Sequence, residues 1–283
     1  MFLSNQRTPI YLFVLFTLTF STPFYYLART RDALVYGQGM VWCPAMAALL
    51  TAKLVKRDIS TFGWRWPDFG LWLKSYLIPI GYAFAAYLFI WLAGLGGFYD
   101  RAFVDQITRR FGFGGLPVAT VLILFVILFG TIGMINYMGL ALGEEIGWRG
   151  FLVPELSRHM SFTKTSLISG VLWSVWHYPL LISGRLSAEL VYSLACFTTM
   201  VIGMSFALAW LRLRSGSLWT AVLLHSSHNL FISRIFTPLT VDNNKTKYFI
   251  DETGAALALA GLVLGAIFWN MNRKHPVIDS HLG

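Results

Sequence analysis

The sequence predicts an all-α polytopic membrane protein, with about eight transmembrane helices around a polar intramembrane cavity. Of its 283 residues, 56% are hydrophobic and only 12% are charged, whereas a soluble domain is about 25% charged. Apolar runs of the length that crosses a bilayer recur along the chain. The few polar residues inside these runs are of the kinds that form sites, which predicts a polar cavity between the helices.

Eight apolar segments are long enough to span the hydrocarbon core, which needs about 20 residues. They are residues 9–28, 33–55, 71–97, 116–142, 165–183, 189–211, 218–236 and 253–271. The first is long and aromatic and lacks a clear small-residue cleavage site, so we interpret it as a helix and not as a signal peptide. Residues 99–115 alternate arginines with apolar residues, which predicts a short amphipathic interfacial helix. We expect residues 151–164 to connect the fourth and fifth spans.

The net charge of +9 comes from basic residues in short loops. This pattern favours contact with anionic lipid headgroups and orientation by the positive-inside rule. Nucleic-acid binding is excluded, since there is no basic run, zinc-finger spacing or RNA-binding motif. Eight spans put both chain ends on one side, and that side has the larger share of the 22 Lys and Arg residues. We therefore expect a multi-pass protein of the cell (plasma or inner) membrane with cytoplasmic termini.

No internal repeat divides the chain, so residues 1–283 are expected to form a single integral membrane domain. The two cysteines, Cys43 and Cys196, lie inside apolar segments. They are expected to be buried small hydrophobic residues, not a disulfide or a metal pair.

The stretch GEEIGWRG follows the fourth apolar run, and its charges are costly in or near a membrane. On a helix, Glu145 and Arg149 are four residues apart and can pair. Glu144 lies about 100° round the helix from Glu145, so it remains free for chemistry. The alternative interpretation is an interfacial charge cluster that marks the end of a helix.

Polar residues also interrupt two later spans. His177 lies in WSVWHYP, near the middle of the fifth span, while His225 and Asn229 lie in LLHSSHN, four residues apart and on one helical face. His228 shares much of that face. Taken singly, such residues are more often packing or helix-joining groups. Together with Glu144, they would meet in one cavity open to the cytoplasm and form an acid–base and oxyanion constellation.

Three motifs occur in order on separate spans: EEIGWR at residues 144–149, WSVWH at 173–177 and HSSHN at 225–229. This ordered set resembles the CPBP intramembrane protease family, which includes type II CAAX prenyl endopeptidases and bacterial homologues linked to bacteriocin processing and self-immunity. The resemblance covers residues 116–236, the expected protease core. The family's second motif usually begins with Phe, whereas this chain has Trp173 there.

The resemblance implies an intramembrane endopeptidase whose partner is a peptide or protein substrate, including membrane-associated ones. By match, Glu144 and His177 activate a water, and His225 and Asn229 hold the tetrahedral oxyanion. Arg149 holds Glu145 and fixes the helix end. No cofactor is predicted. In a zinc-dependent version, Glu144, His177 and His225 would be the metal ligands. The H-E-x-x-H spacing is absent, and we favour the metal-free mechanism.

Two interpretations from other functional classes stay open. A non-catalytic membrane immunity or scaffold protein of the same fold would use these polar residues for packing. A small transporter would use the glutamate and histidines to relay protons. The absence of a repeated half or of an interrupted helix pair counts against the transporter.

Overall fold

The computed structural model describes residues 7–31, 33–182 and 186–277. Within these ranges the chain is almost entirely helical, and the described strands are only two residues long. Five helices in the described part are long and apolar enough to cross a membrane. The prediction of an all-α polytopic membrane protein is therefore confirmed, while the number of crossings stays a prediction. The end of the fifth expected span, residue 183, lies outside the described residues.

The first expected span is helix α1 (Thr8–Thr30). The second is not continuous, because it divides into α2 (Ala33–Met40) and α3 (Cys43–Leu54). Pro44 stands in the first turn of α3. Proline has no N–H to bond to the preceding turn, so it is tolerated there and favours the start of a new helix.

The third expected span is α4 (Phe69–Leu92), which begins where the Asp68 side chain accepts a hydrogen bond from the Leu71 N–H. A short 3₁₀ turn (Ile59–Phe62) precedes it. After α4, strand β1 (Gly97–Phe98) pairs antiparallel with β2 (Thr240–Val241). This small ladder ties the chain after α4 to the segment that follows the seventh expected span.

The amphipathic helix expected within residues 99–115 is α5 (Arg101–Phe111). It buries Val104 and Ile107 and exposes its basic residues, as the sequence pattern predicts. It ends at Gly112, which has a left-handed φ of 69° that favours glycine.

The fourth expected span is part of one continuous helix of 40 residues, Val118–Ser157. Its parts are α6 (Val118–Leu128), a π-helical segment (Phe129–Gly133), α7 (Met134–Glu145), a second π-helical segment (Ile146–Leu152) and α8 (Val153–Ser157). The prediction that residues 151–164 form the connection is therefore wrong for residues 151–157. The charged stretch does not end the helix either, because its charges are buried and neutralised within it.

The remaining helices follow the expected spans closely. They are α9 (Phe162–Leu181), α10 (Ala188–Ser215), α11 (Trp219–Phe231), a π-helical turn (Ile232–Phe236), α12 (Thr237–Leu239), a 3₁₀ turn (Thr246–Tyr248) and α13 (Ala255–Lys274). Cys43 and Cys196 are both free and buried, as expected.

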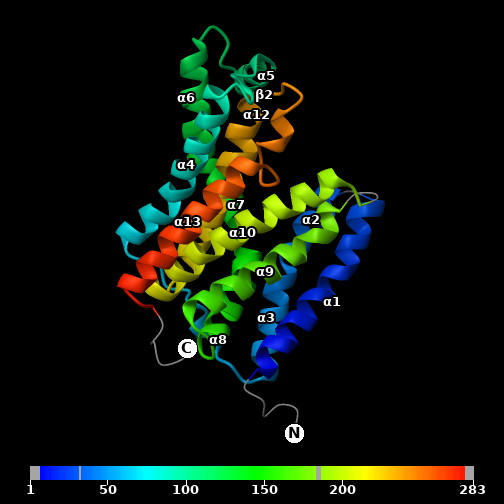
Figure 1. Ribbon diagram of the computed structural model, residues 1–283, viewed down its shortest axis with the longest axis vertical. Coiled ribbons are helices and arrows are strands. Elements are labelled where there is room, and N and C mark those ends of the chain that lie inside the picture. Colours follow the sequence, from blue (N-terminus) through cyan, green and yellow to red (C-terminus); the bar gives the residue numbers. More distant parts are fainter. Residues whose placement is uncertain (1–6, 32, 183–185, 278–283) are drawn as a thin grey trace.

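Helix α10 runs through the centre of the molecule and packs against α13 and α9 (Figure 1). Its contact with α13 is a contact of backbones: a Cβ at Gly203 would lie 2.0 Å from the Gly261 carbonyl oxygen. Only glycine permits this approach, which in a membrane maximises van der Waals contact between helices. In Figure 1 the start of α1 and the end of α13 lie in the lower part of the view, whereas α5, β2 and α12 lie at the top.

Candidate active site

The glutamate–arginine pair predicted from the four-residue spacing is present and fully buried. Arg149 Nη1 donates a hydrogen bond of 2.9 Å to Glu145 Oε1, and both side chains are 0% exposed. Arg149 also donates to Ser205 Oγ at 3.2 Å, and its guanidinium lies 4.2 Å from the centroid of the Trp173 ring. A buried charge is costly unless it is paired and hydrogen-bonded, and the two charges here neutralise each other. Glu145 Oε2 and Arg149 Nε have no hydrogen-bond partner among the described residues.

Glu145 has a second partner that the sequence did not predict. His225 Nδ1 lies 2.9 Å from Glu145 Oε1, the same oxygen that Arg149 contacts. A carboxylate held by a guanidinium only accepts hydrogen bonds, so His225 carries a proton on Nδ1. Glu145 thereby fixes the orientation of the His225 imidazole on α11, and it also balances the charge of Arg149.

Glu144 is free of this pair and faces α9. Trp173 Nε1 donates a 2.8 Å hydrogen bond to Glu144 Oε2, and His177 Nε2 lies 3.9 Å from the same oxygen. His177 Nδ1 lies 2.9 Å from the Trp173 carbonyl oxygen, which can only accept, so Nδ1 carries a proton and Nε2 is the nitrogen that can accept one. A gap of this size between two acceptors fits one water molecule bonded to both at ~2.8 Å.

Trp173 holds the two halves of the site together. The centroid of its indole lies 5.9 Å from that of the His177 ring and 5.1 Å from that of the His225 ring, edge to face in both cases. The sequence predicted only an aromatic wall at this position. The indole N–H bond to Glu144 is an addition that a phenylalanine cannot make.

The structure thus brings Glu144, His177 and His225 around one indole, whereas the sequence predicted a cavity that these three residues share with Asn229. Asn229 lies one turn beyond His225 on α11 and is partly buried. His228 differs from the expectation, because it contacts α4 and the segment before α13 and not the His225 side of the helix. The roles of these residues stay predictions.

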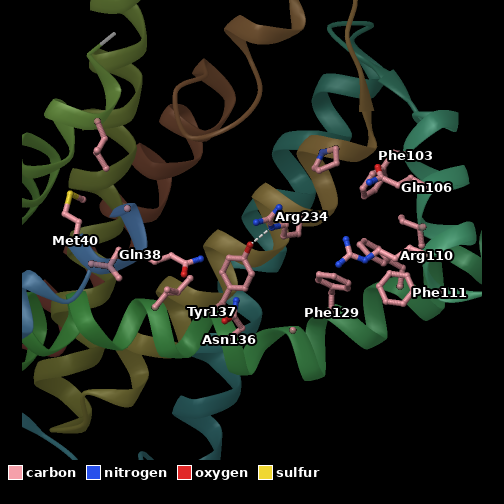
Figure 2. Close-up of a pocket in the computed structure, with 18 of the residues that line it drawn as sticks. Gln38, Met40, Phe103, Gln106, Arg110, Phe111, Phe129, Asn136, Tyr137 and Arg234 are labelled. Carbon is pink, nitrogen blue, oxygen red and sulfur yellow. Dashed lines mark hydrogen bonds between the residues drawn. The ribbon is translucent and has the colours of Figure 1, made fainter. Parts of the chain in front are cut away.

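His177 is also part of the wall of a cavity of about 920 Å³. Figure 2 shows the cavity between α2, α5 and α7, with Arg234 bonded to the Tyr137 hydroxyl at its centre. The side chains of Phe103, Phe111, Phe125 and Phe129 supply an apolar wall.

The cavity is lined from α5 and from Pro238 of α12, which lie away from the chain ends in Figure 1. The predicted cavity that is shared by Glu144, His177, His225 and Asn229 and opens to the cytoplasm stays a prediction, because only His177 of these residues lines this cavity. Glu144 lies more than three turns before the end of its helix, about 20 Å at ~1.5 Å per residue. His177 lies about four turns into α9, so both residues are deeper than the sequence placed them.

The zinc ligand set considered from the sequence does not fit this geometry. Among the described residues, no group of three or more His, Cys, Asp or Glu side chains is arranged to hold a metal ion. His225 Nδ1 is bonded to Glu145, and Glu144 Oε2 accepts the Trp173 N–H. A tetrahedral site with Glu144, His177 and His225 would require these bonds to be rearranged.

Comparison with known proteins identifies the same region of the chain. Residues 120–231 match the family model described as "Type II CAAX prenyl endopeptidase Rce1-like". The matched region is therefore similar to the CPBP intramembrane protease family, which the three motifs also resemble. The chain is also 27% identical over 128 residues to a curated protein of Methanococcus maripaludis named "CAAX prenyl protease 2". That match covers 43% of this chain and 44% of the relative, so the chain spans less than half of the relative's length.

The two adjacent glutamates, Glu144 and Glu145, are expected to differ in their effect on stability. Glu145→Gln leaves Arg149 without a counter-charge in a buried site and should lower the free energy of unfolding by about 3–5 kcal/mol. Glu144→Gln keeps an acceptor for the Trp173 N–H and should leave membrane abundance close to wild type. Thermal unfolding in detergent and quantitative blotting of membranes measure the difference, and equal losses in the two variants would contradict it.

Proposed function

We propose that the protein is an intramembrane endopeptidase that hydrolyses a peptide bond with a water activated by Glu144 and His177. One observation carries the proposal: Glu144 Oε2 and His177 Nε2 lie 3.9 Å apart, with the neighbouring glutamate already neutralised. An unpaired carboxylate beside an imidazole acceptor, both within the membrane domain, is an arrangement for removing a proton from water. The match of residues 120–231 to the type II CAAX prenyl endopeptidase model supports the same chemistry.

In the proposed reaction, the water bound between Glu144 and His177 gives up a proton to this pair as its oxygen bonds to the carbonyl carbon. The carbonyl oxygen becomes an oxyanion. The proton is then delivered to the amide nitrogen, the C–N bond breaks, and a carboxylic acid and an amine are released. His177 is held ready for this task because its Nδ1–H donates to the Trp173 carbonyl, leaving Nε2 as the acceptor.

His225 and Asn229 are proposed to stabilise the oxyanion. Since Nδ1 of His225 donates to Glu145, only the doubly protonated ring has an Nε2–H to offer. Glu145 therefore supports the protonated form that the role requires. The amide of Asn229, one turn along α11, supplies the second donor. Preorganised donors of this kind contribute about 3–4 kcal/mol each in proteases.

The proposed substrate is a peptide segment of a membrane-associated protein. The cavity at His177 combines a wall of phenylalanine rings with Gln38, Gln106 and Asn136, which suits a chain that is partly apolar and partly polar. The name of the Methanococcus relative, a CAAX prenyl protease, supports a membrane-associated substrate for this chain. Membrane lipids are its other expected partners, through the exposed arginines of α5.

Membrane proteomics provides the test of function. Membranes of a deletion strain and of a Glu144→Gln strain should lose the same truncated products and accumulate the same precursors. A purified Glu144→Gln protein should cleave such a precursor about 10²–10⁴-fold more slowly than wild type, the range that general acid–base groups supply. If the Glu144→Gln strain retains the products at normal abundance of the protein, the enzyme assignment is wrong and a binding or scaffold role takes its place.

We propose that no metal takes part in the reaction. Asn229→Ala then removes a transition-state donor and should lower kcat by about 10²–10³-fold with little change in KM. Purified protein should contain no stoichiometric zinc and keep its activity in a strong chelator. One zinc per chain, with activity lost on chelation and restored by zinc, would reject this assignment and make Glu144, His177 and His225 ligands.

We propose eight crossings of the cell membrane with cytoplasmic termini, supported by the larger share of Lys and Arg on the side of the chain ends. A reporter fused after Gly283 should give a cytoplasmic signal. An extracytoplasmic signal there would overturn either the number of crossings or the orientation.

A further inference from the structure

His177 stands in the last two turns of α9, where the helix is weakest. Pro179 lies inside the helix and has no N–H, so the Val175 carbonyl lacks its usual partner within the helix. The last carbonyls of a helix also lack partners in the helix itself. The His177 ring nevertheless needs a fixed place if its Nε2 is to stay 3.9 Å from Glu144 Oε2.

Helix α1 supports this part of α9 through the residue that precedes His177. The indole N–H of Trp176 donates a 2.8 Å hydrogen bond to Ser21 Oγ, and the Trp176 carbonyl oxygen accepts a hydrogen bond from the Tyr25 hydroxyl. Ser21 and Tyr25 are four residues apart, so they share one face of α1. Ser21 and Trp176 are both buried. The side chain and the carbonyl of one buried tryptophan are thus both held by one turn of α1.

A third contact from α1 reaches the end of α9. Arg29 Nη2 donates a 3.0 Å hydrogen bond to the Pro179 carbonyl oxygen and also contacts the carbonyl oxygen of Ile182. A guanidinium in this position satisfies carbonyls that the helix leaves open, and the negative end of the helix dipole favours its charge. Arg29 lies four residues after Tyr25, so successive turns of one face of α1 bond to residues 176–182.

Trp176 in turn contacts the His177 ring directly. The two ring centroids lie 4.7 Å apart with the rings at 84°, which is closer than the Phe197 ring at 5.4 Å or the Trp173 ring at 5.9 Å. Edge-to-face contacts of this kind favour one orientation of a ring. Because Nδ1 is bonded to the Trp173 carbonyl, the orientation of the His177 ring decides where Nε2 lies. A displaced Trp176 would therefore move Nε2 relative to Glu144.

We propose that Ser21 and Tyr25 are positioning residues of the candidate site, which hold Trp176 and, through it, keep Nε2 of His177 in place for proton transfer. The inference rests on the proposed function. Both hydroxyls act through Trp176 and not by contact with the substrate. Helix α1 lies outside residues 120–231, the region that matches the protease model. A helix that carries none of the three motifs thus supports the site.

Simple packing of α1 against α9 would use the same contacts, but the two roles have different signatures. Packing alone contributes to stability and leaves the His177 ring unchanged when a hydroxyl of α1 is removed. A positioning role changes the environment of His177 and the rate of cleavage in protein that remains folded, with little effect on substrate binding. The test therefore needs a readout at His177 itself.

The experiment compares full-length wild type with Tyr25→Phe, Ser21→Ala, the double variant and Tyr26→Phe, each labelled with ¹⁵N-histidine in detergent micelles. Tyr26 is the matched control, because it is the next tyrosine of α1 and its side chain is 68% exposed. The His177 signals are assigned by the substitution His177→Gln. We expect the double variant to shift the His177 imidazole signals and each single variant to shift them less. Tyr26→Phe should leave them in place.

The second readout is cleavage of the precursor that accumulates in the Glu144→Gln strain, measured with each purified variant. The double variant should lower kcat about 10–10²-fold with little change in KM, since a misplacement of about 1 Å costs up to about 10²-fold. Tyr25→Phe removes a single oxygen atom and carries the test if the double variant does not fold. Tyr26→Phe should keep the wild-type kcat.

The two proposals fail in different ways. Unchanged His177 signals, or an unchanged kcat, would overturn the positioning role while the endopeptidase assignment stands. Truncated products that persist in the Glu144→Gln strain would instead remove the proposed function, and this inference with it.

Discussion

The buried ion pair between Glu145 and Arg149 is the constraint on which the rest of the site depends. Two unpaired charges at this depth would have to be exposed to water, and the helix would have to end there. Because they neutralise each other at 2.9 Å, the helix continues to Ser157 and carries the glutamates into the molecule. Glu145 Oε1 also accepts a hydrogen bond from His225, and the Arg149 guanidinium lies over the Trp173 ring. One neutralised carboxylate thereby positions groups from α9 and α11 around the other.

The two adjacent glutamates, Glu144 and Glu145, therefore have different surroundings although their side chains are identical. Glu145 is fully committed to Arg149 and His225, whereas Glu144 is bonded to a single neutral donor and faces an imidazole across a gap that fits a water. The π-helical segment that follows them changes the direction of side chains over one turn, a distortion that frequently accompanies functional sites. A regular α-helix would keep the two carboxylates in the same relation, but it would change how Trp148 to Leu152 pack behind them.

Much of this arrangement was predictable from the sequence, because helical spacing is short-range. The Glu145–Arg149 pair follows from a four-residue interval, and the all-α membrane fold follows from apolar runs of sufficient length. The errors arise where the tertiary structure overrides a rule that is based on neighbouring residues alone. The charged stretch was placed at a helix end because exposed charges usually end spans, but here burial and pairing removed the reason to stop. The His225–Glu145 bond, the Trp173 N–H and the contact of Glu252 with His228 join elements distant in the chain. No single-sequence spacing encodes such contacts.

The backbone contact between α10 and α13 has a consequence for the order of events during synthesis. Gly203 and Gly261 approach so closely that α13 can pack against α10 in essentially one position. The segment that carries Glu252 leads directly into α13. The motifs at residues 144–229 leave the ribosome before α13 does, so their side chains are present on the nascent chain before α13 can pack against α10. The carboxylate of Glu252, which precedes α13 and lies 3.3 Å from His228, likewise reaches this histidine only after the motifs have been made.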